Sequence, residues 1–203
     1  MHQYQPESVH RVMLKLSGEI LAGSKGFGFD DAVIDDLTDE LIAVKRLGYS
    51  IAIVFGGGNI FRGGSWKNQN LNRVTLDSIG MLATIQNALY LAEILESKGY
   101  GARVFSSFAL DKVVELYSPA KARAALEEGQ ICFLAGGTGN PFFTTDTAAV
   151  LRACELGLDL VLKGTKVDGL YSADPKTDPS ATFIQSASYQ ECIERKLGVM
   201  DMT

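Results

Sequence analysis

Histidine and cysteine are scarce in this chain of 203 residues. The two histidines, His2 and His10, both precede the first expected strand, which nearly removes histidine-based acid–base catalysis and histidine-ligated metal sites from consideration. The three cysteines, Cys132, Cys154 and Cys192, are an odd number without a C-x-x-C pair. We therefore expect reduced, mostly core thiols in a cytoplasmic protein.

Excess positive charge and long apolar runs are also lacking. The net charge is -5 and the pI is near 5.1, which argues against a nucleic-acid-binding protein because such proteins usually carry a basic face. We find no apolar run that looks long enough to span a bilayer. Residues 1–8 are polar, without the apolar core of a secretory signal. We expect no nucleic-acid partner and no membrane.

The common motifs of nucleotide-binding and hydrolytic enzymes are missing as well. The chain contains no G-x-x-x-x-G-K-[ST] phosphate loop and no G-x-G-x-x-G after a strand. It also lacks the G-x-S-x-G elbow of hydrolases and the H-E-x-x-H of zinc proteases. An enzyme that transfers phosphoryl groups would therefore have to hold phosphate in another way.

What the sequence does contain is an alternation of strand and helix patterns. Arg11–Leu16 alternates apolar and polar residues, as a strand does, while Ser50–Phe55 and Ile131–Ala135 are short apolar runs typical of strands buried on both faces. From Asp31 the apolar period becomes helical until Gly48. Further helices are expected over 74–97, 119–128, 145–155 and 189–197, and further strands over 102–105 and 158–162, with a hairpin turn at 167–170.

This order of elements predicts an α/β fold. Strands that alternate with helices form right-handed βαβ units, which give a mainly parallel sheet with helices on both faces. Neither an internal repeat nor a low-complexity linker divides the sequence. We therefore expect residues 1–203 to form a single domain.

Glycine follows three of the predicted strands. The turns are Ser17-Gly18, Gly56 to Asn59 and Gly136 to Gly139. Ligands of parallel sheets bind beyond the carboxyl ends of the strands, where glycines let backbone N–H groups approach phosphate oxygens. Each turn alone is equally well explained as a tight strand–helix connection, but three together favour a site for two phosphorylated substrates.

Cations and one acid lie at the same strand ends. Lys15 and Lys163 end predicted strands, the second of which we interpret as buried on both sides, and Arg62 follows the triple glycine. Phosphoryl transfer requires such positive charge around the migrating group. Asp146 falls in the first turn of a predicted helix and could orient the lysines, or only compensate the helix dipole for about 0.5 kcal/mol. For a lone strand-terminal lysine, a solvated head on an apolar stem is the simpler explanation, but it suits Lys163 less well because the preceding strand is interpreted as buried on both sides.

Five segments carry a resemblance to a known family. They are Lys15-Leu-Ser-Gly-Glu19, Gly56-Gly-Gly-Asn-Ile-Phe-Arg-Gly63, Met81-Leu-Ala-Thr84, Gly139-Asn-Pro-Phe-Phe-Thr-Thr-Asp146 and Leu162-Lys-Gly-Thr-Lys-Val-Asp-Gly169. From about Arg11 onward the chain resembles the bacterial UMP kinases of the amino acid kinase family. The segment from Thr138 to Asp146 is highly specific to them, whereas Lys-x-Ser-Gly alone is typical of the wider family.

The resemblance implies a fold, a reaction and a set of ligands. The implied fold is a three-layer αβα sandwich around a mainly parallel central sheet. The implied reaction is ATP-dependent phosphorylation of UMP to UDP in cytoplasmic pyrimidine nucleotide biosynthesis, with Mg²⁺ accompanying ATP and no dedicated metal site in the protein. The resemblance also implies a homohexamer built from dimers, with UTP as inhibitor and GTP as activator.

It further implies roles for individual residues. The catalytic residues would be Lys15, Arg62, Asp146 and Lys163. ATP would be bound by Lys15, Leu16, Ser17, Gly18, Gly58, Arg62, Thr165, Tyr171 and Asp174. UMP would be bound by Gly57, Asp77, Thr138, Gly139, Asn140, Pro141, Phe142, Phe143, Thr144 and Thr145. GTP would bind at Gly23, Ser24, Lys25, Gly26, Phe27 and Gly28. For Phe142 and Phe143, plain core packing is an equal alternative.

The sequence departs from the family pattern in two places. Relatives continue by about one helix and two strands beyond the segment that ends here at Thr203, so we expect the C-terminal end of the domain to be incomplete. Positions that are basic in GTP-activated relatives carry Ala92, Glu96 and Gln130, with only Arg103 basic.

Two other functions stay open at this point. The same fold could phosphorylate a carboxylate or carbamate acceptor, against which the segment from Thr138 to Asp146 argues. A nucleotide-binding sensor that responds to UTP and has lost catalysis is the other alternative, against which the intact Lys15, Arg62, Asp146 and Lys163 argue.

Overall fold

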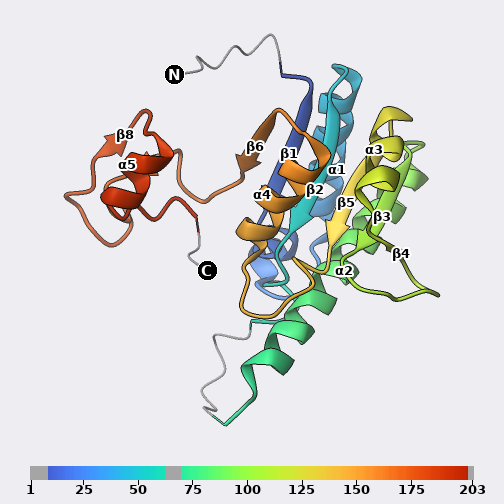
Figure 1. Ribbon diagram of the computed structural model, residues 1–203, viewed down its shortest axis with the longest axis horizontal. Coiled ribbons are helices and arrows are strands. Elements are labelled where there is room, and N and C mark those ends of the chain that lie inside the picture. The colour runs from blue at the N-terminus through green and yellow to red at the C-terminus, as the bar shows by residue number, and fades with distance from the viewer. Residues whose placement is uncertain (1–8, 63–69, 201–203) are drawn as a thin grey trace.

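A parallel six-stranded sheet forms the centre of the computed structural model, which describes residues 9–62 and 70–200 (Figure 1). The strands are β1 (Arg11–Leu16), β2 (Ser50–Phe55), β3 (Ala102–Ser106), β4 (Glu115–Leu116), β5 (Ile131–Ala135) and β6 (Leu160–Lys163). They lie in the order β4-β3-β5-β2-β1-β6, and every pairing between them is parallel. The predicted α/β class with a parallel sheet is confirmed.

Helices cover both faces of this sheet. They are α1 (Asp31–Arg46), α2 (Arg73–Ser97), α3 (Pro119–Glu127) and α4 (Thr145–Leu156), and a 3₁₀ segment, η2 (Gly18–Lys25), follows β1. Beyond β6 come a short antiparallel pair, β7 (Leu170–Tyr171) and β8 (Phe183–Ile184), and helix α5 (Tyr189–Glu194). In Figure 1 these last elements lie to one side of β6.

Strand β2 shows how the sequence builds two cores. Side chains alternate across a strand, so Ile51, Ile53 and Phe55 pack with α1 and α2 on one face of the sheet. Ala52 and Val54 pack with α3 and α4 on the other. Because both faces are covered, the uniformly apolar pattern of β2 and β5 is explained, and their predicted burial is confirmed.

Strand β6 does not share this burial. We predicted that it would be buried on both sides, which is wrong: β6 lies at the edge of the described sheet and Leu162 is 45% exposed. Its start is tied to β1 by Asp159, whose carboxylate accepts from the Arg11 guanidinium at 2.9 Å. That hydrogen bond, helped by the backbone N–H groups of His10 and Arg11, lowers the pKa of Asp159 to about 2.

Helix α2 is apolar over most of its length. By length and composition it could cross a bilayer, which corrects our expectation that no segment could, but core helices of globular proteins meet the same test. Its second half packs on the sheet through residues such as Leu91 and Leu95, whereas no residue before Ala83 is buried. Figure 1 shows this first half extending beyond the sheet.

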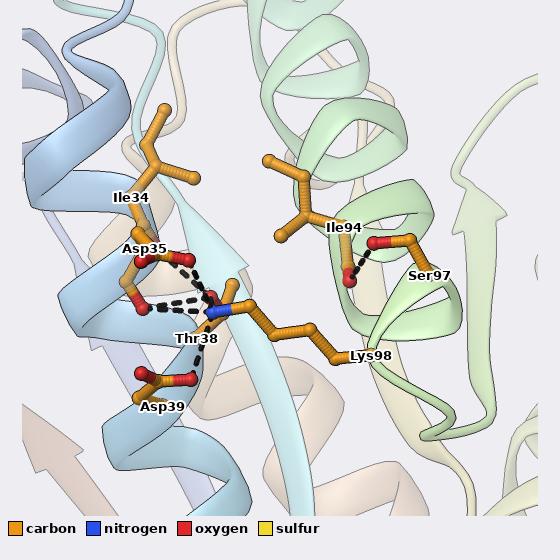
Figure 2. Close-up of polar contacts among 7 residues, drawn as sticks. All are labelled: Ile34, Asp35, Thr38, Asp39, Ile94, Ser97 and Lys98. Atoms are coloured by element: carbon orange, nitrogen blue, oxygen red, sulfur yellow. Dashed lines mark hydrogen bonds and ion pairs between the residues drawn. The ribbon is translucent and has the colours of Figure 1, made fainter.

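Lys98, directly after α2, anchors the end of the helix to α1. Its ammonium group lies 2.8 Å from Thr38 Oγ1 and 2.8 Å from Asp39 Oδ1, and it also pairs with Asp35 (Figure 2). Burial disfavours the charge, but the hydrogen bonds to the two aspartates outweigh it and raise the pKa of Lys98. The anchor fixes α2 relative to α1.

Several local predictions are wrong. Thr144, not Thr145, caps α4 by accepting from the N–H of Thr147. The segment 167–170 is no hairpin turn, because β7 pairs with β8 more than ten residues later. Cys154 is exposed rather than buried.

Candidate active site

Two lysines and one aspartate meet at the carboxyl ends of β1 and β6. Lys15 and Lys163 are direct partners in the parallel register of these strands. Each lies two residues after an apolar residue, Met13 or Val161, that packs toward α3 and α4, so both lysines point to the same face of the sheet. Asp146 meets them there: its Oδ1 lies 2.6 Å from Lys15 Nζ and its Oδ2 lies 2.7 Å from Lys163 Nζ.

The first turn of α4 holds the carboxylate in this position. The Thr144 cap begins the helix, so Asp146 follows one residue after the first helical position and is only 1% exposed. Lys15 is also buried, with 8% exposure. Because two ammonium groups share one carboxylate, the cluster keeps a net positive charge, which suits a group that attracts phosphate oxygens. The dipole explanation of Asp146 does not account for these two contacts.

The glycines that follow β1 and β2 allow the two turns to touch. A Cβ on Gly18 would lie 2.2 Å from the carbonyl oxygen of Gly56, and a Cβ on Gly57 would lie 2.7 Å from the carbonyl oxygen of Gly80 in α2. Both positions therefore need glycine for close packing. The turn after β2 is thus enclosed by η2 on one side and by α2 on the other.

Arg62 and Glu19 lie on the outer side of the same turn. Arg62 Nε donates to the carbonyl of Gly58 at 3.0 Å, and its NH2 group lies 3.0 Å from Glu19 Oε1. Glu19 also accepts from Lys166 at 2.7 Å. The hydrogen bond from Lys166 lowers the pKa of Glu19, and the charge of Arg62 adds to the effect. Lys166 is a further cation of the site, and the strand-end pattern did not predict it.

A cleft of about 330 Å³ opens beside these turns. It is lined by Gly56, Gly57, Phe61, Arg73, Leu76, Asp77, Gly80, Met81, Thr84, Gly137, Asn140, Phe143 and Thr145. Five of the ten residues assigned to UMP are among them, namely Gly57, Asp77, Asn140, Phe143 and Thr145. The α2 residues Arg73, Leu76 and Gly80 were missed, although Arg73 and Gly80 lie four and three residues from Asp77, a spacing that places them on its face of the helix.

Asp77 connects α2 to the loop across the cleft. Its Oδ1 accepts from Arg73 Nε and its Oδ2 accepts from the backbone N–H of Phe142, both at 2.7 Å. Phe142 has a φ of +71°, uncommon for a bulky residue, and its side chain is 58% exposed. Phe143 is 54% exposed. The core-packing explanation for both phenylalanines is therefore wrong.

The loop itself is braced by threonine and serine hydroxyls. Thr138 Oγ1 accepts from the N–H of Asn140 at 3.2 Å. Ser107 Oγ donates to the carbonyl of Gly137 at 2.6 Å and receives a hydrogen bond from Arg152. Gly139, Pro141 and Thr144 complete the loop between β5 and α4. Gly57 and Asp77 thus line one cleft together with Asn140, Phe143 and Thr145 of this loop.

Comparison with known proteins agrees with this geometry. The sequence model of the amino acid kinase family matches residues 10–203. The chain belongs to the amino acid kinase family. Within it, the structure resembles UMP kinase from Bacillus anthracis, with a TM-score of 0.89 and 38% identity over 94% of this chain and 79% of that one.

Two other solved structures are similar. UMP kinase from Ureaplasma parvum has a TM-score of 0.88 and 35% identity, covering 95% of this chain and 82% of that one. Uridylate kinase from Archaeoglobus fulgidus has a TM-score of 0.68 and 26% identity, covering 90% and 76%. The predicted resemblance to UMP kinases of the amino acid kinase family is confirmed.

The residues assigned to the ATP nucleoside lie outside the cleft. Thr165, Tyr171 and Asp174 belong to the segment after β6, where Tyr171 donates to Asp168 and packs edge-on against Phe183. Their segment approaches the cluster through Lys166, which binds Glu19, and through the N–H of Gly164, which donates to the carbonyl of Lys15 at 2.8 Å.

The segment assigned to GTP lies next to the Gly56–Asn59 turn. Gly28 donates its N–H to the carbonyl of Asn59 at 2.8 Å and accepts from the Asn59 side chain at 3.0 Å. Phe27 is 69% exposed. The remaining members of this segment are Gly23, Ser24, Lys25 and Gly26.

Carboxylates of the site are already engaged by cations. Within residues 9–62 and 70–200, no group of three or more metal-ligating side chains occurs. Asp146 is shared by two lysines and Glu19 by Arg62 and Lys166. This donor set fits a Mg²⁺ ion that is carried by nucleotide oxygens and water rather than by protein ligands.

Proposed function

We propose that this protein transfers the γ-phosphoryl group of ATP to UMP and forms UDP and ADP. The observation that carries the proposal is the pairing of Lys15 and Lys163 on Asp146 at one strand-end edge, beside a cleft whose lining includes five of the residues assigned to UMP. The similarity to UMP kinases supports the choice of acceptor.

The acceptor would occupy the cleft. Asp77 lies on its wall, and a carboxylate has enough lone pairs to accept from ribose hydroxyls in addition to Arg73 and Phe142. Thr145, at the first helical position of α4, and the turn at Gly57 would face the monophosphate, because backbone N–H groups at a helix start favour anions.

Transfer then needs positive charge more than a base. A phosphate oxygen of UMP, already anionic, attacks the γ-phosphorus in line, and the bond from that phosphorus to the β–γ bridging oxygen breaks, so ADP leaves with the electron pair. Lys15 and Lys163 would stabilise the charge on the transferred group, with Arg62 at the adjoining turn. Asp146 would hold the two ammonium groups in place, and no proton acceptor is required.

The magnesium ion would reach the site on ATP. When present with ATP, Mg²⁺ would supply positive charge that offsets the charge of the nucleotide phosphates. The protein residues near it contribute ammonium groups rather than carboxylates, since Asp146 is taken up by Lys15 and Lys163.

A panel of acceptors tests the assignment. We expect Mg·ATP turnover with UMP to exceed that with CMP, dUMP, carbamate and acetylglutamate by about 100-fold or more, because a site that hydrogen-bonds a substrate rejects analogues that leave its polar groups unpaired. Coupled ADP release measures it. Turnover with a carboxylate or carbamate but not UMP would contradict the proposal, and UTP binding in calorimetry without turnover would favour the sensor.

The further implications of the resemblance remain predictions. They are a place in cytoplasmic pyrimidine nucleotide synthesis, inhibition by UTP, activation by GTP through residues 23–28, and assembly into a hexamer.

A further inference from the structure

Two asparagine side chains face each other in the interior behind the glycine turns. Asn59 follows the triple glycine and Asn87 lies in the middle of α2, and both are 0% exposed. Asn59 Nδ2 donates to Asn87 Oδ1 at 2.9 Å, while Asn87 Nδ2 donates to Asn59 Oδ1 at 2.8 Å. Burying an amide without a hydrogen-bond partner is costly. Each asparagine therefore supplies a partner that the other needs in this buried position.

Each amide uses its remaining N–H group on a glycine carbonyl. Asn87 Nδ2 donates to Gly56 at 2.8 Å, and Asn59 Nδ2 donates to Gly28 at 3.0 Å. The backbone of Asn59 also accepts from the N–H of Gly28. A Cβ on Gly18 would lie 2.6 Å from Asn59 Oδ1. The pair therefore joins α2 to the turns at positions 18, 28 and 56.

Neither asparagine lines the cleft, yet both hold elements that do. Gly56 and Gly57 form one wall, and Asp77, Gly80 and Met81 of α2 form another. Lys98 fixes the end of the same helix to α1 (Figure 2). The hydrogen bond from Asn87 to Gly56 is thus a direct link between the two walls.

We propose that Asn87, together with Asn59, is a positioning residue of the reaction: it fixes the Gly56–Gly58 turn against α2 so that the turn meets the phosphate groups beside Lys15. This inference rests on the proposed function. In phosphoryl transfer, positioning supplies most of the catalysis, and a misplacement of about 1 Å can cost about 100-fold in rate. Asn87 acts through Gly56, so its loss should change turnover more than substrate binding.

The test compares Asn87→Ala with Thr38→Val. Thr38 is likewise 0% exposed and donates to the carbonyls of Ile34 and Asp35 in α1; it also accepts from Lys98, whose ammonium group keeps its ion pairs with Asp35 and Asp39 in Thr38→Val. Both variants remove buried hydrogen bonds, and both should lower Tm. We expect kcat for UMP to fall about 30- to 100-fold in Asn87→Ala, with a change in KM below about threefold, and to change less than about twofold in Thr38→Val.

Amide hydrogen exchange of the nucleotide-free protein gives a second readout that does not depend on activity. We expect exchange over 54–58 to be about tenfold or more faster in Asn87→Ala than in Thr38→Val, because the Gly56 carbonyl loses its anchor. Asn87→Ser, which keeps a polar group at the position, replaces the alanine variant if that does not fold.

Two results overturn the positioning role: unchanged exchange over 54–58, or a kcat loss no larger than that of Thr38→Val. A wild-type protein without UMP turnover would instead contradict the proposed function. In that case the exchange comparison still decides whether Asn87 anchors the turn, and kcat is compared with whichever acceptor is used.

Discussion

Asp146 combines two properties that rarely occur together in a side chain without a functional task. It is almost completely buried, and it binds two ammonium groups, of which the Lys15 group is itself largely shielded from water. Bringing three charges out of water is costly, and a buried ion cluster often stabilises a fold no better than apolar packing would. The arrangement is therefore better explained by the reaction than by stability.

Replacing the carboxylate of Asp146 by an amide tests whether the residue serves the reaction. Asp146→Asn keeps the size of the side chain but removes the charge that orients Lys15 and Lys163. We expect kcat for UMP to fall about 100-fold or more, with a loss of unfolding free energy on the order of 1–3 kcal/mol. Steady-state kinetics and urea unfolding measure the two effects.

Asp159→Asn is the matched control for this substitution. Asp159 joins β1 to the start of β6 through Arg11, at the opposite end of the same strand pair. Its replacement should cost about 1 kcal/mol of stability, since the pair is partly exposed, and should leave kcat within about twofold. If Asp146→Asn unfolds, or loses no more activity than Asp159→Asn, the helix-dipole explanation is the better one.

Individual residues of the site could be predicted where a strand end determined them. Lys15 is the last residue but one of β1 and Lys163 ends β6, and a parallel sheet gathers such ends at one edge. The helix cap was misplaced by one residue because Thr144 and Thr145 are adjacent and chemically equivalent. Whether Phe142 is buried could not be predicted either, since exposure depends on a hydrogen bond to Asp77, 65 residues away.

At the level of elements, α2 supports both glycine turns of the site. Asn87 holds Gly56, and Thr84, one turn earlier, accepts from the N–H of Gly136 at 2.8 Å. Thr84 also donates to the carbonyl of Met81 and lines the cleft. One helix therefore sets the position of the turn after β2 and of the turn after β5.

Thr84→Val should mainly raise KM, whereas Asn87→Ala should mainly lower kcat. Valine leaves the N–H of Gly136 without its partner and displaces the loop assigned to UMP. An unpaired buried group costs about 1–3 kcal/mol, so we expect KM for UMP to rise about tenfold, with a smaller change in kcat. The comparison is with Thr75→Val, an exposed position in the first turn of the same helix. Equal KM values in the two variants would contradict the assignment.

The supporting role of α2 could have been inferred from its pattern. Thr84 and Asn87 are polar residues three positions apart among the apolar residues that face the sheet, and buried polar side chains require hydrogen-bond partners. Strand β4 could not be predicted, because two residues carry no periodicity. The edge position of β6 was also missed, since a run of four residues does not reveal how many strands flank it.

For the whole molecule, the segment after β6 is the part whose structure could be predicted least well from the sequence. The sheet and its helical layers follow from alternating patterns, whereas β7, β8 and α5 are short and largely exposed. Lys166 and the carbonyl of Val199, which accepts from Lys163 at 3.0 Å, bring this segment to the site. The ATP-binding role assigned to this segment is a prediction. It depends on contacts between regions that are distant in the sequence.

Limited proteolysis with trypsin tests that role. Lys176 is exposed between β7 and β8, two residues from Asp174, whereas Lys112 is exposed near β4 at the opposite edge of the sheet. We expect Mg·ATP at saturation to slow cleavage after Lys176 about tenfold and to leave cleavage after Lys112 unchanged, because a bound ligand suppresses local opening only where it binds. Mass spectrometry identifies the fragments. Equal protection at both sites, or none at Lys176 under conditions where calorimetry detects ATP binding, would place the nucleoside elsewhere.

The direct pairing of Lys15 with Lys163 makes the chemistry depend on strand alignment. Successive side chains point to opposite faces, so a slip of β6 by one residue along β1 would turn Lys163 away from Asp146 and bring Leu162 into its place. Such a misaligned chain would keep most of its core and its secondary structure, yet it would lack one of the two ammonium groups. Assays of folding by circular dichroism alone would count these molecules as native, and only titration of active sites would separate them.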